Sequence, residues 1–133
     1  MQLEKPIYKK PFENIDTYEE STWMGNDTPF METEYTGVFR DKYPCTSGHT
    51  LFIPKKNTPE YVGQSYGLAY EYGNKKVKEG KIMGFNVGMN IGLCAGQTIL
   101  WPHIHFIPRH EGDAEHHGGM RYTHPSADHN HYY

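Results

Sequence analysis

The sequence of 133 residues has few cysteines, no long apolar run and no excess of positive charge. Its two cysteines, Cys45 and Cys94, form neither a disulfide framework nor a Cys-x-x-Cys metal knuckle. No apolar stretch approaches the roughly 20 residues that cross a bilayer, and the first residues lack the apolar core of a signal peptide. The 13 basic and 16 acidic residues give a net charge of -3, which argues against coating nucleic acid or membranes. We expect a cytoplasmic protein without a nucleic-acid or membrane partner.

Aliphatic residues are also scarce. Ile, Leu, Val and Phe together number 23, while 11 Tyr, 6 Met and 2 Trp supply the remaining large apolar side chains. The length is that of one domain, which at this size buries about two thirds of the surface of its unfolded chain. The core is therefore expected to be thin and aromatic. Pairing of two copies into a homodimer would add buried surface.

The hydrophobic pattern predicts one long helix and several strands. The helix is expected from Pro59 to Glu79, after Thr58 as its N-cap, because apolar residues recur every three or four positions. Period-two alternation and turn residues indicate strands at residues 35–40, 49–54, 85–91 and 98–107. The last two are expected to form an antiparallel hairpin across the short turn LCAGQ. Residues 1–34 are expected to be an irregular arm that lies on the domain.

The last predicted strand carries two histidines on one face. Trp101, His103 and His105 alternate with apolar residues and therefore share a face. Histidines at positions i and i+2 of a strand lie about 6 to 7 Å apart. They could be ligands of one metal ion, a nucleophile and its helper, a general acid and base, or surface residues without a role.

The residues around this pair favour phosphate chemistry. Gly96, Gln97 and Thr98 offer backbone N–H groups, an amide and a hydroxyl, and Asn90 adds a second amide. Arg109 can bind phosphate through two parallel hydrogen bonds. The alternative for the Gly-Gln-Thr run is an ordinary hairpin turn. A neutral imidazole beside such donors is suited to nucleophilic attack on phosphorus.

Several separated blocks of the sequence resemble the histidine triad (HIT) superfamily of nucleotide hydrolases and transferases. The blocks are SGHTLFIPKK at residues 47–56, GFNVGMNIGLCAGQTILWPHIHFIPRHEGD at residues 84–113 and GGMR at residues 118–121. The resemblance implies an α+β fold, a HIT-like antiparallel sheet of about five strands with one main helix and a second short helix. It covers residues 30–125, between an N-terminal arm (1–29) and a His-rich C-terminal tail (126–133).

The resemblance also implies roles for residues at the site. His103, the middle triad position, would attack the α-phosphorus of a nucleotide, while His105 would steady a phosphate oxygen and His49 would support both. Trp101 replaces the first triad histidine but keeps the backbone carbonyl that can accept a hydrogen bond from Nδ1–H of His103. Residues expected to contact nucleotide or phosphate are Asn90, Gly96, Gln97, Thr98, Trp101, Arg109 and, at the ribose, Asp41. Candidates for the purine pocket are Phe30, Tyr35, Val38, Phe39 and Ile53.

These residues predict a hydrolase that cleaves a dinucleoside polyphosphate or a nucleoside phosphoramidate through a nucleotidyl-histidine and releases a nucleoside monophosphate. The alternatives are transfer of the nucleotidyl group to another acceptor and a module that binds nucleotide without turnover. No cofactor is required by the resemblance, although Mg²⁺ or Mn²⁺ could accompany the substrate phosphates. Residues 110–133 hold six of the nine histidines, but their spacing matches no metal site and we assign no metal there.

Overall fold

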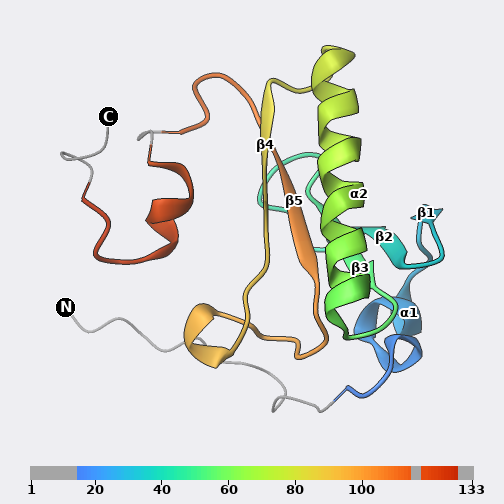
Figure 1. Cartoon of the computed structure of the whole chain (residues 1–133). Helices are drawn as coiled ribbons and strands as arrows, with labels where there is room; N and C mark the ends of the chain where they lie inside the picture. Colours follow the sequence, from blue (N-terminus) through green and yellow to red (C-terminus); the bar gives the residue numbers. More distant parts are fainter. Residues whose placement is uncertain (1–14, 115–117, 129–133) are drawn as a thin grey trace.

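The computed structural model describes residues 15–114 and 118–128. Within them, a five-stranded sheet has the strand order β1-β2-β3-β5-β4 with every neighbouring pair antiparallel, and the long helix α2 lies along one face (Figure 1). The predicted α+β fold is confirmed. The elements are η1 (Tyr18–Glu20), α1 (Thr22–Asn26), β1 (Met31–Glu32), β2 (Thr36–Arg40), β3 (Thr50–Pro54), α2 (Pro59–Lys78), β4 (Gly84–Gly88), η2 (Leu93–Ala95), β5 (Ile104–Arg109) and η3 (Gly119–Thr123). Across these ranges, every helix falls short of the length and apolarity that crossing a membrane requires.

Helix α2 begins and ends close to where the sequence indicates. The Thr58 side chain accepts a hydrogen bond from the Tyr61 N–H, and Pro59 occupies the first turn, where its missing N–H costs nothing. Three lysines lie in the last turn, where the helix dipole favours cations. Gly80, with φ of 73°, redirects the chain just beyond the helix.

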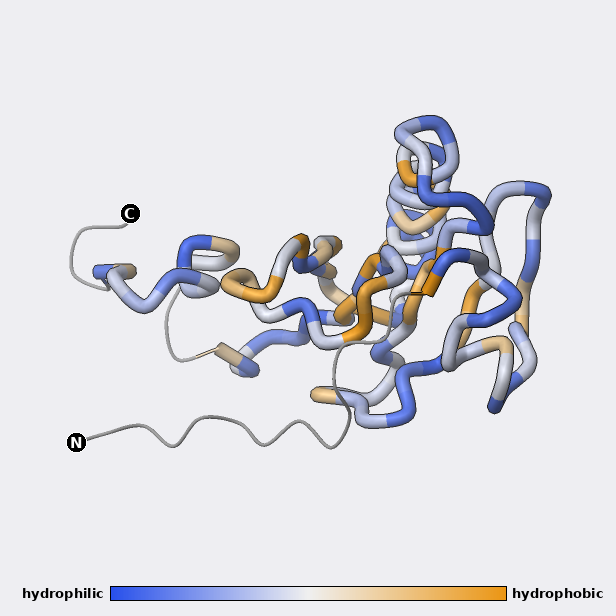
Figure 2. The backbone as a smooth tube through the Cα atoms, turned by 90° about the horizontal axis from the view of Figure 1, so that it is seen from below, coloured by the Kyte–Doolittle hydropathy of each residue, from blue (hydrophilic) through white to orange (hydrophobic). Residues whose placement is uncertain are grey.

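The two faces of the sheet carry separate apolar clusters. The buried residues on the α2 face are Val38, Phe52, Ala69, Ile82, Ile104 and Phe106. Those on the opposite face are Tyr18, Phe39, Leu51, Ile53 and Trp101, with Ile15 and Trp23 packed against them. Successive strand residues point to opposite faces, which divides Val38 from Phe39 and Phe52 from Ile53. Figure 2 shows hydrophobic residues concentrated along the strands and hydrophilic residues along much of α2.

The connection between β4 and β5 differs from the predicted hairpin turn. The two strands do pair in antiparallel register, but residues 89–103 lie between them and contain only η2. Gly92 and Gly96 both adopt φ of 91°, which breaks the extended conformation, and Pro102 has no N–H for a strand ladder. The prediction of strand structure at 98–103 was therefore wrong, although the register at Gly88 and His105 brings both segments to one place.

The segment before β1, in its described part, is partly ordered into two short helices. Thr17 caps η1 and Ser21 caps α1 through side-chain hydrogen bonds. Tyr18 is only 3% exposed and packs on the sheet face opposite α2. The described segment thus contains regular structure that the irregular arm expected for residues 1–34 did not include.

Two glycines in α2 provide a matched test of this packing. A Cβ at Gly73 would lie 2.5 Å from the Phe85 ring, whereas a Cβ at Gly67 would meet nothing within 4 Å. We expect Gly73→Ala to lower the free energy of unfolding by about 1–3 kcal/mol through overpacking. Gly67→Ala should raise it by about 0.5–1 kcal/mol, because alanine favours the helix. Urea unfolding measures both, and equal effects of the two substitutions would contradict the packing of α2 on β4.

Candidate active site

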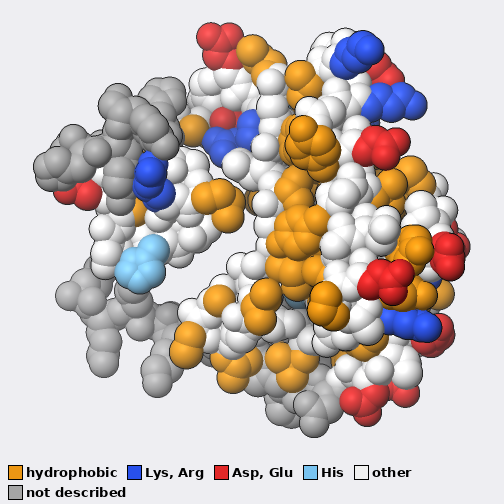
Figure 3. All heavy atoms as spheres, in the orientation of Figure 1, with side chains coloured by type: hydrophobic (Ala, Val, Ile, Leu, Met, Phe, Trp, Pro, Cys, Tyr) orange, Lys and Arg blue, Asp and Glu red, His pale blue; other side chains and the backbone are white. Residues whose placement is uncertain are grey.

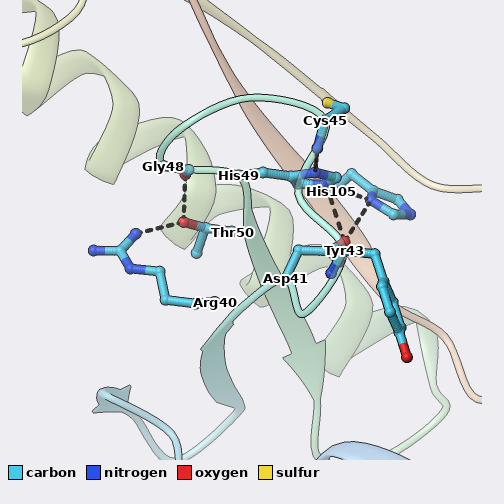
Figure 4. Close-up of polar contacts among 8 residues, drawn as sticks. All are labelled: Arg40, Asp41, Tyr43, Cys45, Gly48, His49, Thr50 and His105. Atoms are coloured by element: carbon cyan, nitrogen blue, oxygen red, sulfur yellow. Dashed lines mark hydrogen bonds and ion pairs between the residues drawn. The ribbon is translucent and has the colours of Figure 1, made fainter.

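Asp41, His49, His103 and His105 converge on the sheet face opposite α2. Asp41 follows the end of β2, and His49 directly precedes β3. Antiparallel pairing sets Leu51 opposite His105. Because Leu51 and His49 are two residues apart, both side chains point to the sheet face opposite α2. Figure 4 shows His49, His105 and Asp41 pointing toward one another, while Arg40 points away toward Thr50.

A backbone hydrogen bond determines which nitrogen of His49 carries the proton. The Cys45 N–H donates to His49 Nδ1 at 3.1 Å, so the neutral ring holds its proton on Nε2. That Nε2 lies 2.9 Å from His105 Nδ1 and 3.2 Å from Asp41 Oδ2 (Figure 4). His105 Nδ1 therefore accepts, and the proton of the neutral His105 ring is on its Nε2.

His103 has the opposite arrangement. Its Nδ1 lies 2.9 Å from the carbonyl oxygen of Trp101, which can only accept, so Nδ1 carries the proton and Nε2 keeps a free lone pair. The expected hydrogen bond to the carbonyl at position 101 is therefore present. The ring centroids of His103 and His105 are 5.2 Å apart. Two adjacent imidazoles thus differ in their Nε2 atoms: that of His103 has a free lone pair, and that of His105 carries a proton.

The three histidines are neutral at pH 7. Burial lowers the pKa of His49 and of His103 below the ordinary value of 6.5. Burial, together with the neighbouring His103 and His49, lowers the pKa of His105 to about 4. The nearby Asp41 carboxylate opposes the shift at all three rings but does not outweigh burial.

A cavity of about 1020 Å³ lies beside His49 and His105. Its other walls come from β4, the connection after β4 and residues 120–125, and Figure 3 shows the molecule hollowed beside the C-terminal segment. The described lining includes Asn86, Asn90 and His124 but no Lys, Arg, Asp or Glu. Histidines and one cysteine are thus the only titratable side chains in the described lining, and a large ligand could reach the histidine cluster through the cavity.

The predicted phosphate-binding residues lie in different surroundings. Asn90 lines the cavity, and the Gly96 backbone lies close to its amide. The Gln97 side chain instead braces the loop, accepting from the Gly92 N–H at 2.8 Å and donating to the Ile99 carbonyl at 3.0 Å. Thr98 is exposed next to it. Their contact with a nucleotide stays a prediction.

Arg109 and Asp41 have internal partners. The Arg109 guanidinium donates to Asp113 at 2.9 Å and to Asn86 Oδ1 at 2.7 Å. Asp41 accepts from the Tyr43 N–H at 2.8 Å through Oδ1 and faces His49 through Oδ2. Asp41 therefore belongs to the histidine cluster, and no observation tests its expected contact with ribose.

Trp101 lies in the apolar cluster opposite α2, lining neither described cavity. It is 4% exposed, and its indole N–H donates to the Pro54 carbonyl at 2.9 Å. Of the purine-pocket candidates, Phe39 and Ile53 share this cluster, whereas Val38 faces α2. The alternation of side chains along the strands therefore places Val38 on the opposite face of the sheet from Phe39 and Ile53.

Sequence reasoning missed two residues that touch the histidines. Trp23 of α1 contacts His103 with a ring-centroid separation of 4.9 Å, and Cys45 orients His49 through its backbone N–H. No local pattern marks Trp23, because the contact joins segments about 80 positions apart. Among the tail histidines, His124 lines the cavity, while the remaining predicted cluster at 116, 117, 129 and 131 lies outside the described residues.

Asp41, His49 and His105 also form a group that could hold a metal ion. Their nearest ligand atoms all lie within 4.8 Å of one another. An ion would need the lone pair of His49 Nε2. The Cys45 N–H at Nδ1 places a proton on that nitrogen instead. The group is therefore arranged as a hydrogen-bonded relay that leads from Cys45 through His49 to His105.

Comparison with known proteins gives a consistent family. The HIT domain matches residues 25–112. An uncharacterized HIT-like protein of Methanocaldococcus jannaschii is 36% identical over 90 residues, which cover 63% of this chain and 70% of the relative. The adenylylsulfatase HINT3 of Arabidopsis thaliana is 36% identical over 80 residues, 55% of this chain and 41% of that protein.

Solved structures share the fold. A Zn-bound histidine triad family protein from Mycobacterium smegmatis has a TM-score of 0.57 at 32% identity, covering 62% of this chain and 66% of that one. The diadenosine triphosphate hydrolase of Plasmodium falciparum, solved with cyclomarin A, has a TM-score of 0.57 at 26% identity, covering 63% and 62%. The chain thus spans slightly less than two thirds of each of these proteins.

The buried position of Trp101 generates a stability prediction. Trp101→His should lower the free energy of unfolding by about 2–4 kcal/mol, because the smaller ring leaves a cavity in the apolar cluster. Trp101→Phe should cost less, since it loses the hydrogen bond to Pro54 but retains more of the packing. Chemical denaturation measures both. A wild-type unfolding midpoint for Trp101→His would show that the indole is not part of the packed core.

The lowered pKa values predict a loss of stability on acidification. Below pH 6.5 the unfolded chain protonates His105 before the folded protein does, since the folded pKa is about 4. The free energy of unfolding should therefore fall as pH decreases from 6.5 toward 4. In His105→Asn this contribution is absent, so the decline should be shallower. Urea titrations at several pH values give both slopes, and identical slopes would refute the burial of a neutral His105.

Proposed function

The chain belongs to the HIT domain family, and we propose that it is a nucleotide hydrolase that uses His103 as its nucleophile. The observation that carries the proposal is the pair of opposite tautomers at neighbouring rings. His103 Nε2 has a lone pair because Nδ1–H is bonded to the Trp101 carbonyl, and His105 Nε2 carries a proton because Nδ1 accepts. Similar proteins named an adenylylsulfatase and a diadenosine triphosphate hydrolase support a nucleotide substrate.

In the first step, the lone pair of His103 Nε2 forms a bond to the α-phosphorus. The bond from phosphorus to the leaving group breaks, and its electron pair departs with that group, which takes up a proton. His103 then carries positive charge, which the Trp101 carbonyl stabilises through Nδ1–H. The Nε2–H of His105 donates to a phosphate oxygen as negative charge grows there. One such donor is worth about 3–4 kcal/mol.

In the second step, water attacks the phosphorus of the nucleotidyl-histidine. The N–P bond breaks, its electron pair returns to Nε2, the water loses a proton and the nucleoside monophosphate is released. The lowered pKa of His103 keeps the ring neutral and nucleophilic at pH 7. The scheme needs no resident cofactor, and Mg²⁺ or Mn²⁺ would enter with substrate phosphates.

The cavity beside His105 favours one of the two expected substrate classes. It is large enough for a leaving group, and its described lining carries no cation. A polyphosphate leaving group would place several further negative charges there without compensation. A nucleoside phosphoramidate, whose leaving amine carries no phosphate, suits this lining better.

Pairing of two copies and a cytoplasmic location are part of the proposal. Strand β4 ends the sheet and leaves an edge that a second copy could cover. Exposed apolar residues near it, Met83, Ile91 and Leu93, support such an interface. Both cysteines are free, which suits a reducing compartment.

The nucleophile can be tested by trapping the intermediate. Wild-type protein incubated with adenosine phosphoramidate or diadenosine triphosphate should release AMP, and acid-free quenching should show an adenylyl group on His103 by mass spectrometry. His103→Ala should lower kcat by at least about 10⁴-fold, as expected for loss of a nucleophile. His105→Asn should lower it by about 10²–10³-fold, as for one lost donor.

The exposed His110, which lies just beyond β5, supplies the matched control. His110→Ala should retain wild-type turnover, because its ring takes no part in the cluster. Binding of AMP without any AMP release from either substrate would contradict the hydrolase and favour a binding module. Release that depends on an added acceptor would favour a transferase.

A further inference from the structure

The proposed nucleophile is covered on one side by a residue of the N-terminal segment. His103 is 6% exposed and does not line the cavity, whereas His105 does. The Trp23 ring lies 4.9 Å from the His103 ring, centroid to centroid, with an angle of 47° between the planes. Trp23 itself is half-buried. The half-buried indole therefore packs against the imidazole and covers part of its surface.

The segment that carries Trp23 is anchored to the sheet independently of that contact. Ser21, 1% exposed, caps α1 by accepting from the Met24 N–H. Tyr18 is buried against the sheet face opposite α2, and its hydroxyl occupies the space beside Gly37, where a Cβ would lie 2.1 Å from it. Capping and burial thus hold α1 at the sheet, so that Trp23 is presented to His103.

We propose that Trp23 is a positioning residue of the active site, whose indole packs against His103 and shields this ring from water. The inference deepens the proposed function and rests on it, because it assigns the shielded ring to the nucleophile. Trp23 lies two residues before the start of the HIT domain match at residue 25.

Shielding also accounts for the neutral state of the ring. Removal of water is the main cause of the lowered pKa of His103. The charged group that acts on His103 is the Asp41 carboxylate after β2, which opposes the lowering of the pKa, and the titratable rings near it are His105 of β5 and, beside that ring, His49. Helix α1 contributes only Thr, Trp, Met, Gly and Asn, none of which is charged. Trp23 therefore acts by excluding water and not through an electrostatic interaction.

Histidine modification in the intact protein tests the shield without requiring turnover. Diethyl pyrocarbonate at pH 7.5 would label accessible neutral rings, and tandem mass spectrometry of the tryptic peptide 82–109 would resolve His103 from His105. His103 should be labelled several-fold faster in Trp23→Ala and Trp23→Leu than in wild type. Trp23→Phe, which keeps an aromatic ring, should restore slow labelling. Labelling of His110 provides the internal reference.

Met24 supplies the matched control, since it neighbours Trp23 in α1 and is 37% exposed. Met24→Ala should leave His103 labelling at the wild-type rate. The pH dependence of labelling adds a second readout, because the pKa of His103 should rise toward 6.5 when Trp23 is removed. A purely structural role of Trp23 would change the melting temperature without this selective shift.

The possible results distinguish a failure of the proposed shielding by Trp23 from a failure of the proposed hydrolase reaction. If His103 is labelled and titrates in folded Trp23→Ala as it does in wild type, the proposed shielding by Trp23 is overturned, whatever the activity. Trp23→Leu replaces the alanine variant in this comparison if the alanine variant does not melt cooperatively. Faster labelling in these variants supports the shielding. If labelling responds as expected but wild-type protein never forms adenylyl-His103, the hydrolase proposal fails while the covering of this ring by Trp23 stands.

Discussion

The hydrogen bond from His103 Nδ1 to the Trp101 carbonyl sets the chemistry available at this site. An imidazole has one lone pair and one N–H when neutral, and the partner of one nitrogen decides the state of the other. The carbonyl leaves a free lone pair on Nε2 of His103, which is the atom proposed as the nucleophile. The Cys45 N–H has the opposite effect on His49 and, through it, makes Nε2 of His105 a donor. Main-chain groups thus distinguish two rings that are two residues apart in the sequence, one just before β5 and one within it.

This division also explains how the site accommodates tryptophan where histidine was expected. In the proposed reaction, position 101 contributes its backbone carbonyl, which any residue supplies. Its side chain is free to serve the core, where the indole packs with Phe39 and Ile53 and bonds to the Pro54 carbonyl. The second apolar cluster therefore helps to fix the loop that orients His103. Trp101 thus orients His103 through its carbonyl and packs in the core through its side chain.

Neutrality is the second constraint on the site. Burial lowers the pKa values of the three histidines, and the cavity beside them presents amides and apolar groups without a cation. Asp41 is the one carboxylate in the cluster, and it faces His49 and His105 at 3.2 and 3.9 Å. Such surroundings keep the imidazoles neutral at pH 7, and this neutrality is the basis on which a leaving group of little charge is proposed.

The sequence alone determined the local features of this protein. Helix α2 follows from its cap, its proline and its apolar stripe, and the shared face of His103 and His105 follows from the period of a strand. The blocks around Gly48, Gln97 and Arg109 indicated the family and thereby the α+β sheet. These properties depend on neighbouring residues or on short motifs, so they can be read along the chain.

Only the tertiary structure decided which distant groups meet. The Asp41 carboxylate lies against His49 and His105, Gln97 braces its own loop, and Trp23 packs on a ring about 80 positions away. The β4–β5 connection is a long loop because Gly92 and Gly96 adopt positive φ angles and Pro102 lacks the N–H that a strand ladder needs. Tautomers, burial and pKa shifts arise from partners that come together only when the strands pair and the N-terminal segment packs on them, and no local pattern encodes such encounters.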